Sequence, residues 1–156
     1  MTQRSVFQLN GYEVTAEVEG DEVLLDTVRR LGAKSVRGAC GIGVCGTCTV
    51  LVDGKPVSSC LKLTASVDGR SVITSEGLVT DAGLDPVQRA FVERGAYQCS
   101  FCIPAMVLTV RAALDELPAP TVQDMREYLG GNLCRCATYP EILQAVQDLL
   151  CSDGSD

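Results

Sequence analysis

Eight of the nine cysteines in this sequence form two sets of four, and cysteine thiolates are strong metal ligands. The first set has the spacing C-x4-C-x2-C-x11-C and comprises Cys40, Cys45, Cys48 and Cys60. The second has the spacing C-x2-C-x31-C-x-C and comprises Cys99, Cys102, Cys134 and Cys136. Four thiolates are the ligand set of a 2Fe–2S cluster. Two such sites on one short chain indicate a path for electrons rather than a reaction centre.

The loop that carries the first three thiols is rich in glycine, at positions Gly38, Gly41, Gly43 and Gly46. Glycine lets a backbone turn tightly and approach closely, and its loop N–H groups can hydrogen-bond anionic sulfur. A structural zinc site is the alternative, but such sites usually come as two C-x2–4-C pairs. The triplet has instead the spacing of plant-type ferredoxins, which favours a 2Fe–2S cluster.

Two prolines place the second set of thiols near the starts of two helices. Pro104 cannot lie deep inside a helix, so its helix must begin near Cys102, and Pro140 likewise begins the last helix. In an extended segment, Cys134 and Cys136 can face one centre while the residue between them points outward. Helix N-termini favour anionic thiolates. The spacing alone leaves zinc as a serious alternative to a cluster at this site.

The composition excludes several classes of function. The net charge is −7 without a basic run, which argues against binding to nucleic acid or to an anionic membrane. No apolar stretch approaches the roughly 20 residues that span a bilayer, and the N-terminus lacks the charged-then-apolar order of a signal peptide. Nine cysteines without a secretory signal favour metal binding over disulfides, and we expect a cytoplasmic protein. The absence of His excludes Cys–His zinc fingers, Rieske clusters and His-dependent catalytic units.

Residues 1–75 are expected to form an α+β unit. Asn10-Gly11 and Asp53-Gly54 lie between apolar runs and are strong signals for two-residue hairpin turns. The expected strands are 6–9, 12–18, 47–52, 56–60 and 72–74.

Between these hairpins we expect one helix. Asp21 is a candidate cap for a helix that carries Leu24, Val28 and Leu31 on one face and ends at Gly32. Strands around a single helix, with the thiols on a loop beside it, suit the β-grasp arrangement.

From about residue 84 the apolar spacing becomes helical. The expected helices are 85–97, 102–117, 121–129 and 140–150, and Thr121-x-x-Asp124 is a capping-box variant. Four short helices predict a small four-helix bundle domain, so the expected division is 1–75, a linker at 76–84, and 85–156. Cys151 is expected to be a free thiol without a role, and Ser152 to Asp156 a disordered acidic end.

Taken together, the chain resembles the small 2Fe–2S iron–sulfur subunit of the xanthine oxidase family of molybdenum hydroxylases. The resemblance covers nearly the whole chain, and the segments that carry it are CGIGVCGTCTVLVDGKPVSSC (40–60), QCSFCIPAMV (98–107) and GGNLCRC (130–136). The first segment alone would fit many ferredoxins, whereas the second and third in this order are highly specific.

The resemblance implies an electron-transfer subunit of a molybdenum- and flavin-containing hydroxylase or dehydrogenase. The first cysteine set would hold the cluster nearer FAD, and the second the cluster nearer the molybdenum cofactor, with Gln98 and Cys136 contacting the molybdopterin. The partners would be a large subunit with the molybdenum cofactor and a medium subunit with FAD, in a heterotrimer or a dimer of heterotrimers. The substrate, an aldehyde, purine or N-heterocycle, would be converted elsewhere, because this chain has no catalytic residues of its own. A stand-alone two-cluster ferredoxin-type carrier is the alternative.

The sequence departs from the usual family pattern near the second cysteine set. The family often has Gly, Thr and Gly where this chain has Ser100, Ile103 and Ala105, and Thr-Gly in place of Ala137-Thr138. None of these residues is an expected ligand, so the departures concern the surroundings of the second cluster.

Overall fold

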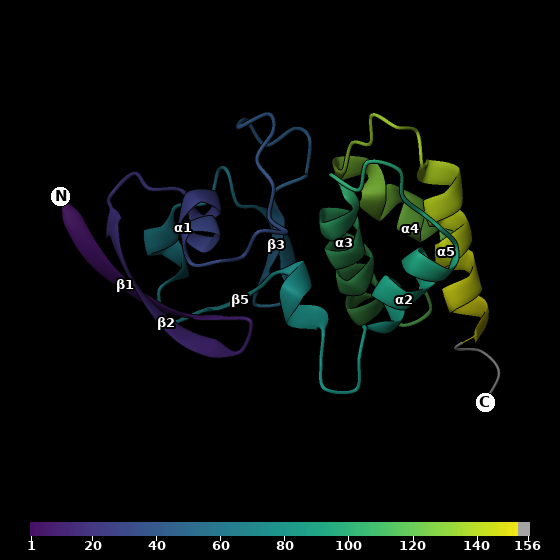
Figure 1. The fold of residues 1–156 in the computed structure, drawn as a ribbon, viewed down its shortest axis with the longest axis horizontal. Coiled ribbons are helices and arrows are strands. Elements are labelled where there is room, and N and C mark those ends of the chain that lie inside the picture. Colours follow the sequence, from purple (N-terminus) through teal and green to yellow (C-terminus); the bar gives the residue numbers. More distant parts are fainter. Residues whose placement is uncertain (153–156) are drawn as a thin grey trace.

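Two hairpins and one further strand build the five-stranded sheet of the N-terminal half (Figure 1). The computed structural model describes residues 1–152, with only the backbone of residue 152. The strands are β1 (Thr2–Leu9), β2 (Tyr12–Glu19), β3 (Thr49–Val52), β4 (Lys55–Ser58) and β5 (Ser71–Ile73), in the order β2-β1-β5-β3-β4. Strand β5 pairs parallel with β1 and antiparallel with β3, and so joins the two hairpins. The expected strands are confirmed, with β5 in the middle of the sheet.

Both predicted hairpin turns form as expected. Asn10 and Gly11 have φ angles of 54° and 85°, and Asp53 and Gly54 have 49° and 80°. Positive φ at both central residues is the type I′ geometry, whose twist matches that of the strands on either side. The local sequence therefore sets the register of both hairpins.

Helix α1 (Leu24–Arg30) packs on the sheet, but the predicted cap at Asp21 is wrong. The N-cap residue is Val23, and no side chain caps the helix. The backbone N–H groups of Leu24 and Leu25 instead donate to the carbonyl oxygens of Lys62 and Ser59, at 2.7 and 3.1 Å. A tertiary contact with the segment around Cys60 thus satisfies the free N–H groups of the first turn. The helix ends before Gly32, as predicted.

The C-terminal half is a bundle of four helices, as predicted. They are α2 (Pro86–Glu93), α3 (Ile103–Glu116), α4 (Val122–Tyr128) and α5 (Tyr139–Ser152). Thr121 and Asp124 form the predicted capping box at the start of α4. Pro104 and Pro140 lie in the first turns of α3 and α5, where a missing N–H costs no hydrogen bond.

Helix α3 also packs against the sheet, and this joins the two halves (Figure 1). Leu108 and Ala112 on α3 are buried together with Leu51 on β3, and Ile73 and Leu78 pack beside them. The sequence pattern predicted one apolar face on this helix, whereas the structure buries a second face against β3. Leu78 closes a short 3-10 helix (Ser75–Leu78) that begins the connection between the halves.

No helix within residues 1–152 is both long and apolar enough to cross a membrane. The predicted disorder of Ser152 to Asp156 lies outside the side chains that the structure describes.

Candidate metal centres

The first cysteine set gathers beside the N-terminus of α1. Cys40, Cys45 and Cys48 lie on the loop between α1 and β3, and Cys60 follows β4. Cys48 and Cys60 are buried, and the other two thiols are half-buried. Three glycines of this loop have positive φ, and one of them, Gly46 at 67°, lies against the other half of the protein. The predicted tight turns are therefore confirmed at Gly41, Gly43 and Gly46, whereas Gly38 does not have a positive φ.

Within the first set the thiols interact in two pairs. The Cys40 thiol lies beside that of Cys45, whose backbone N–H donates to Cys40 Sγ at 3.4 Å, and the Cys60 thiol lies beside that of Cys48. Hydrogen bonds from the loop N–H groups, Ile42 first, lower the pKa of Cys40 to about 6. Burial, followed by the neighbouring Cys48 thiol, raises the pKa of Cys60. Backbone donors thus favour the thiolate form of Cys40, while the buried Cys48 and Cys60 lie where water is excluded.

The second cysteine set lies at the N-terminal ends of α3 and α5. Cys99 and Cys102 precede α3, and Cys134 and Cys136 precede α5. The expected extended segment through Cys136 is wrong, because residues 135–136 form a turn. Arg135 is exposed, as expected, while the thiols on either side of it are half-buried.

Two backbone positions around the second set are strained. Ser100 and Ala137 both have φ of 61°, a region that side chains with a Cβ seldom adopt. These are two of the positions at which the sequence departs from the family pattern. At Ser100 the left-handed turn is therefore made by serine where the family often has glycine, whereas Ala137 stands where the family often has threonine.

The thiols of the second set also interact in two pairs. The Cys99 thiol lies beside that of Cys136, and the Cys102 thiol beside that of Cys134. The N–H of Phe101, followed by the Cys136 thiol, lowers the pKa of Cys99, whereas burial and Cys134 raise the pKa of Cys102 to about 12. In each pair one thiol gives up its proton more readily than the other, and metal binding displaces both protons.

Hydroxyl groups lie against one sulfur of each set. The Thr138 hydroxyl is 3.0 Å from Sγ of Cys134, and the Thr47 hydroxyl is 3.2 Å from Sγ of Cys45. The Thr47 hydroxyl also donates to the carbonyl oxygen of Arg37 at 3.0 Å. The Arg37 carbonyl oxygen therefore competes with the sulfur for the Thr47 hydroxyl proton, whereas the Thr138 hydroxyl has the sulfur as its described partner.

A direct backbone contact joins the two sets. The N–H of Leu133, the neighbour of Cys134, donates to the carbonyl oxygen of Cys45 at 2.9 Å. A crevice of about 460 Å³ lies between the sets, lined by Cys45, Cys99, Cys102, Cys134 and apolar groups that include Phe101 and Leu133. The guanidinium of Arg37 lies over the Phe101 ring, 5.3 Å from its centroid.

The predicted pair Gln98 and Cys136 meets on the exposed side of the second set. Nε2 of Gln98 donates to the carbonyl oxygen of Cys136 at 2.9 Å.

Sequence reasoning missed Asn132, Thr138 and Tyr139, which hold the segment around Cys134. A polar residue beside a loop cysteine has no periodic signal that distinguishes a buried contact from a solvated side chain.

The donor set at each centre fits a 2Fe–2S cluster. Each centre offers four thiols in two interacting pairs, and in a cluster held by four cysteines each of the two irons takes two thiolates. Backbone N–H and hydroxyl donors face the sulfurs, as an anionic cluster requires. Within the described residues, no group of three or more Cys, Asp or Glu side chains is arranged to hold a single metal ion.

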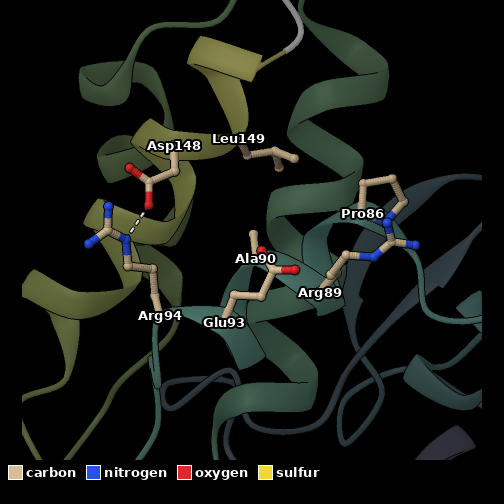
Figure 2. A pocket seen from close by; sticks show the side chains of 7 residues that line it. All are labelled: Pro86, Arg89, Ala90, Glu93, Arg94, Asp148 and Leu149. Atoms are coloured by element: carbon tan, nitrogen blue, oxygen red, sulfur yellow. Dashed lines mark hydrogen bonds and ion pairs between the residues drawn. The ribbon is translucent and has the colours of Figure 1, made fainter.

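A separate pocket of about 510 Å³ lies between α2 and α5 (Figure 2). Its lining includes Arg89 and Glu93 and contains no cysteine. Arg94 forms an ion pair with Asp148 across its rim, which neutralises two of its charged groups. This pocket therefore has no part in the thiol chemistry.

Both halves match models of known protein families. Residues 7–74 match the 2Fe-2S iron-sulfur cluster binding domain, and residues 74–147 match the [2Fe-2S] binding domain. The second match resolves the choice between zinc and a cluster that the spacing left open for the helical half.

Three proteins of named function are similar over almost the whole chain. One nicotinate dehydrogenase subunit of Pseudomonas putida is 41% identical over 141 residues, which cover 90% of each chain. The nicotinate dehydrogenase small FeS subunit of Eubacterium barkeri is 41% identical over 140 residues and 89% of each chain. In the crystal structure of quinoline 2-oxidoreductase from Pseudomonas putida 86, one chain superimposes with a TM-score of 0.91 at 38% identity, covering 98% of this chain and 95% of that one. This chain therefore belongs to the small 2Fe–2S iron–sulfur subunits of the xanthine oxidase (molybdenum hydroxylase) family, the electron-transfer subunits of these oxidoreductases.

Proposed function

We propose that this chain relays electrons from the molybdenum cofactor of a large subunit to the FAD of a medium subunit. Cys40, Cys45, Cys48 and Cys60 would hold the cluster nearer FAD. Cys99, Cys102, Cys134 and Cys136 would hold the cluster nearer molybdenum. When bound, the two clusters supply one-electron carriers between a two-electron oxidation and the flavin. The observation that carries this proposal is the 2.9 Å hydrogen bond from Leu133 N–H to the Cys45 carbonyl oxygen, which joins the two sets directly.

The chain's own residues would hold the clusters, supply donors to their sulfurs and keep water away. The buried thiols of Cys48, Cys60 and Cys102 anchor each centre to its half of the core. Phe101 and Leu133 line the crevice between the centres with apolar surface. A low local dielectric and fixed donors are the protein's main means of setting a cluster's reduction potential.

We propose that Gln98 and Cys136 form the contact with the molybdopterin. Gln98 is exposed, and its amide already meets the backbone of Cys136 on the surface of the second centre. The Cys136 thiol would bind iron while the backbone and Gln98 face the neighbouring subunit. An electron arriving from that subunit would then enter beside an iron ligand.

The two halves would serve as modules with one cluster each. We propose residues 1–75 as the ferredoxin-like module, 76–84 as the linker and 85–156 as the helical module. The shared apolar contact of Leu51 with Leu108 and Ala112 keeps their relative position fixed.

The proposed assembly is a heterotrimer or a dimer of heterotrimers in the cytoplasm. Its substrate would be an aldehyde, a purine or an N-heterocycle. Relatives named for nicotinate and quinoline favour the last class, because both are N-heterocycles.

Iron, acid-labile sulfide and zinc per chain, measured on anaerobically purified protein, would test this proposal. We expect about four irons and four sulfides per chain, with two distinguishable paramagnetic signals after dithionite reduction. Two irons and one signal would leave only the first centre supported. Zinc in the helical half would contradict the proposal.

A further inference from the structure

We propose that Asn132 is a positioning residue that locks the two cysteine sets at one fixed separation. The inference rests on the proposed function, because the separation matters only when both centres hold clusters. Asn132 precedes Leu133 and the Cys134 turn, and its side chain is only 4% exposed. Its amide group contacts both halves of the protein.

Both ends of the Asn132 amide have buried partners. The Nδ2 group donates to the carbonyl oxygen of Gly46 at 3.0 Å, and Oδ1 accepts from the Thr109 hydroxyl at 2.9 Å. Gly46 follows Cys45 in the first loop, and Thr109 lies on α3, which begins directly after Cys102. One side chain thus connects the loop of the first set to the helix of the second.

The backbone around Asn132 is held at the same point. The adjacent Leu133 N–H donates to Cys45, and the Tyr139 hydroxyl donates to the Asn132 carbonyl oxygen at 2.6 Å while accepting from Cys134 N–H at 2.9 Å. Gly46 lies so close that an added Cβ would be 2.2 Å from the carbonyl oxygen of Gly131. The backbones of the two loops are therefore in close contact beside the Asn132 side chain.

This arrangement has a consequence for electron transfer. The rate of electron tunnelling falls steeply with the distance between the two clusters. Small relative movements of the two loops would therefore give a wide range of electron-transfer rates. A buried amide that is satisfied at both ends resists such movement, because breaking either bond leaves a polar group unpaired. The Asn132 amide therefore narrows the distribution of separations between the centres.

Asn132→Ala removes this connection without leaving its partners unpaired. The Gly46 carbonyl oxygen still accepts from the Thr49 hydroxyl at 2.7 Å and from Thr49 N–H at 3.2 Å. The Thr109 hydroxyl still donates to the Ala105 carbonyl oxygen at 3.0 Å. The variant should consequently fold and bind iron. Thr49→Val is the matched control, because it removes a hydrogen bond to the same Gly46 oxygen within the N-terminal half.

Two readouts on the cluster-loaded full chain test the proposal. In Asn132→Ala the amide hydrogen of Leu133 should exchange about fivefold faster, the factor that corresponds to one lost hydrogen bond of about 1 kcal/mol. The magnetic splitting between the two reduced clusters should broaden, while iron content stays at the wild-type level. Thr49→Val should change neither readout. Thr109→Val, which removes only one of the two amide contacts, should change both in the same direction and by less.

The outcomes separate this inference from the proposed function. Unchanged exchange and splitting in Asn132→Ala, or equal changes in Thr49→Val, would overturn the positioning role. If Asn132→Ala did not fold, Thr109→Val would decide by the same two readouts. A wild-type chain without two clusters would instead overturn the proposed function, and the exchange of Leu133 would still decide whether Asn132 locks the loops.

Discussion

The guanidinium of Arg37 lies over the ring of Phe101, 5.3 Å from its centroid, and this contact links the start of the first cysteine loop to the second cysteine set. Arg37 precedes the first loop, and its N–H donates to the Thr47 carbonyl oxygen at 3.3 Å. Phe101 lies between two cysteines of the second set, Cys99 and Cys102. A charge held in this position stabilises the more negative, reduced state of a cluster.

Replacing Arg37 by Gln should therefore lower the reduction potentials of both clusters. Two unit charges about 10 Å apart at an effective dielectric constant of about 40 interact by about 0.8 kcal/mol, or about 35 mV for one electron. Potentiometric titration followed by electron paramagnetic resonance would measure the shift. Arg37→Lys retains the charge and should remain close to the wild-type potentials. Equal shifts in the two variants would show that the charge is not the cause.

The Thr138 hydroxyl should raise the potential of the second cluster selectively. It lies 3.0 Å from Sγ of Cys134, and a hydrogen bond to sulfur stabilises the added electron. Thr138→Val should lower that potential by about 20–60 mV, the equivalent of one hydrogen bond of about 0.5–1.5 kcal/mol.

Thr47→Val is the matched comparison for the first cluster. The Thr47 hydroxyl is near Cys45 but also donates to the Arg37 carbonyl oxygen, so we expect a smaller shift. The same redox titration would compare the two variants. A larger shift in Thr47→Val than in Thr138→Val would contradict this interpretation of the hydroxyl contacts.

Replacing Cys102 by Ser should remove the second cluster and spare the first. Cys102 is 6% exposed and lies beside the Cys134 thiol, so its loss would leave the second centre without its one buried thiol. We expect about two of four irons to be lost, and reduction of the flavin by substrate to stop in the assembled enzyme. Cys151→Ser, outside both sets, should keep the full iron content. Flavin reduction at the normal rate in Cys102→Ser would show that the proposed electron route is wrong.

Glu76 should make the stability of the N-terminal half depend on pH. Burial opposes its ionisation, but hydrogen bonds from Ser35 and Thr74 outweigh burial and lower the pKa of Glu76. The Ser35 N–H donates to the carboxylate at 2.7 Å and the Thr74 hydroxyl at 2.6 Å. The folded-state pKa of Glu76 is therefore below the ordinary carboxyl value of about 4.3. The ionised carboxylate stabilises the folded state fully above about pH 4.3, and this stabilisation is lost as the pH falls through the folded-state pKa.

Glu76→Gln should accordingly cost about 1 kcal/mol of unfolding free energy at pH 7, and progressively less below about pH 4. Denaturant unfolding of both proteins across this pH range would measure the difference. Glu13→Gln, at an exposed position of β2, is the control and should cost little at any pH. A difference that stays constant with pH would exclude the ionised Glu76 as its source.

Local signals predicted the elements well, and tertiary contacts account for the errors. Asn10-Gly11 and the capping box at Thr121 act within a few residues, so their sequence is sufficient to predict them. Asp21 was a reasonable cap by type, but backbone carbonyls from Ser59 and Lys62 occupy that role. No property of residues 21–24 shows that a distant segment will lie there.

The same contrast between local signals and tertiary contacts applies to the candidate site. The spacing of the cysteines and the prolines near them predicted both sets and their helix N-termini, and the thiol ligands remain a prediction. The buried face of Leu108 depends on how the two halves pack, which the periodicity of a single helix does not contain. The turn at residues 135–136 lies between Cys134 and Tyr139, whose hydroxyl accepts from the Cys134 N–H, a contact that has no periodic signal. Asn132 was missed for the same reason, because its partners lie 86 and 23 residues away in sequence.

Gly46→Ala should be the most damaging small substitution at the contact between the loops. Its φ of 67° is unfavourable for alanine, and the new Cβ would be 2.2 Å from a backbone oxygen that has little freedom to move. Strain and overpacking together should cost about 2–4 kcal/mol. Gly54→Ala is the matched control, because its φ is 80° and nothing lies within 4 Å of the new Cβ. It should cost only about 1 kcal/mol. Measuring the free energy of unfolding of both variants would separate the backbone strain from the steric contact. Equal losses of free energy would show that the close approach of the two loops does not add to the cost of Gly46→Ala.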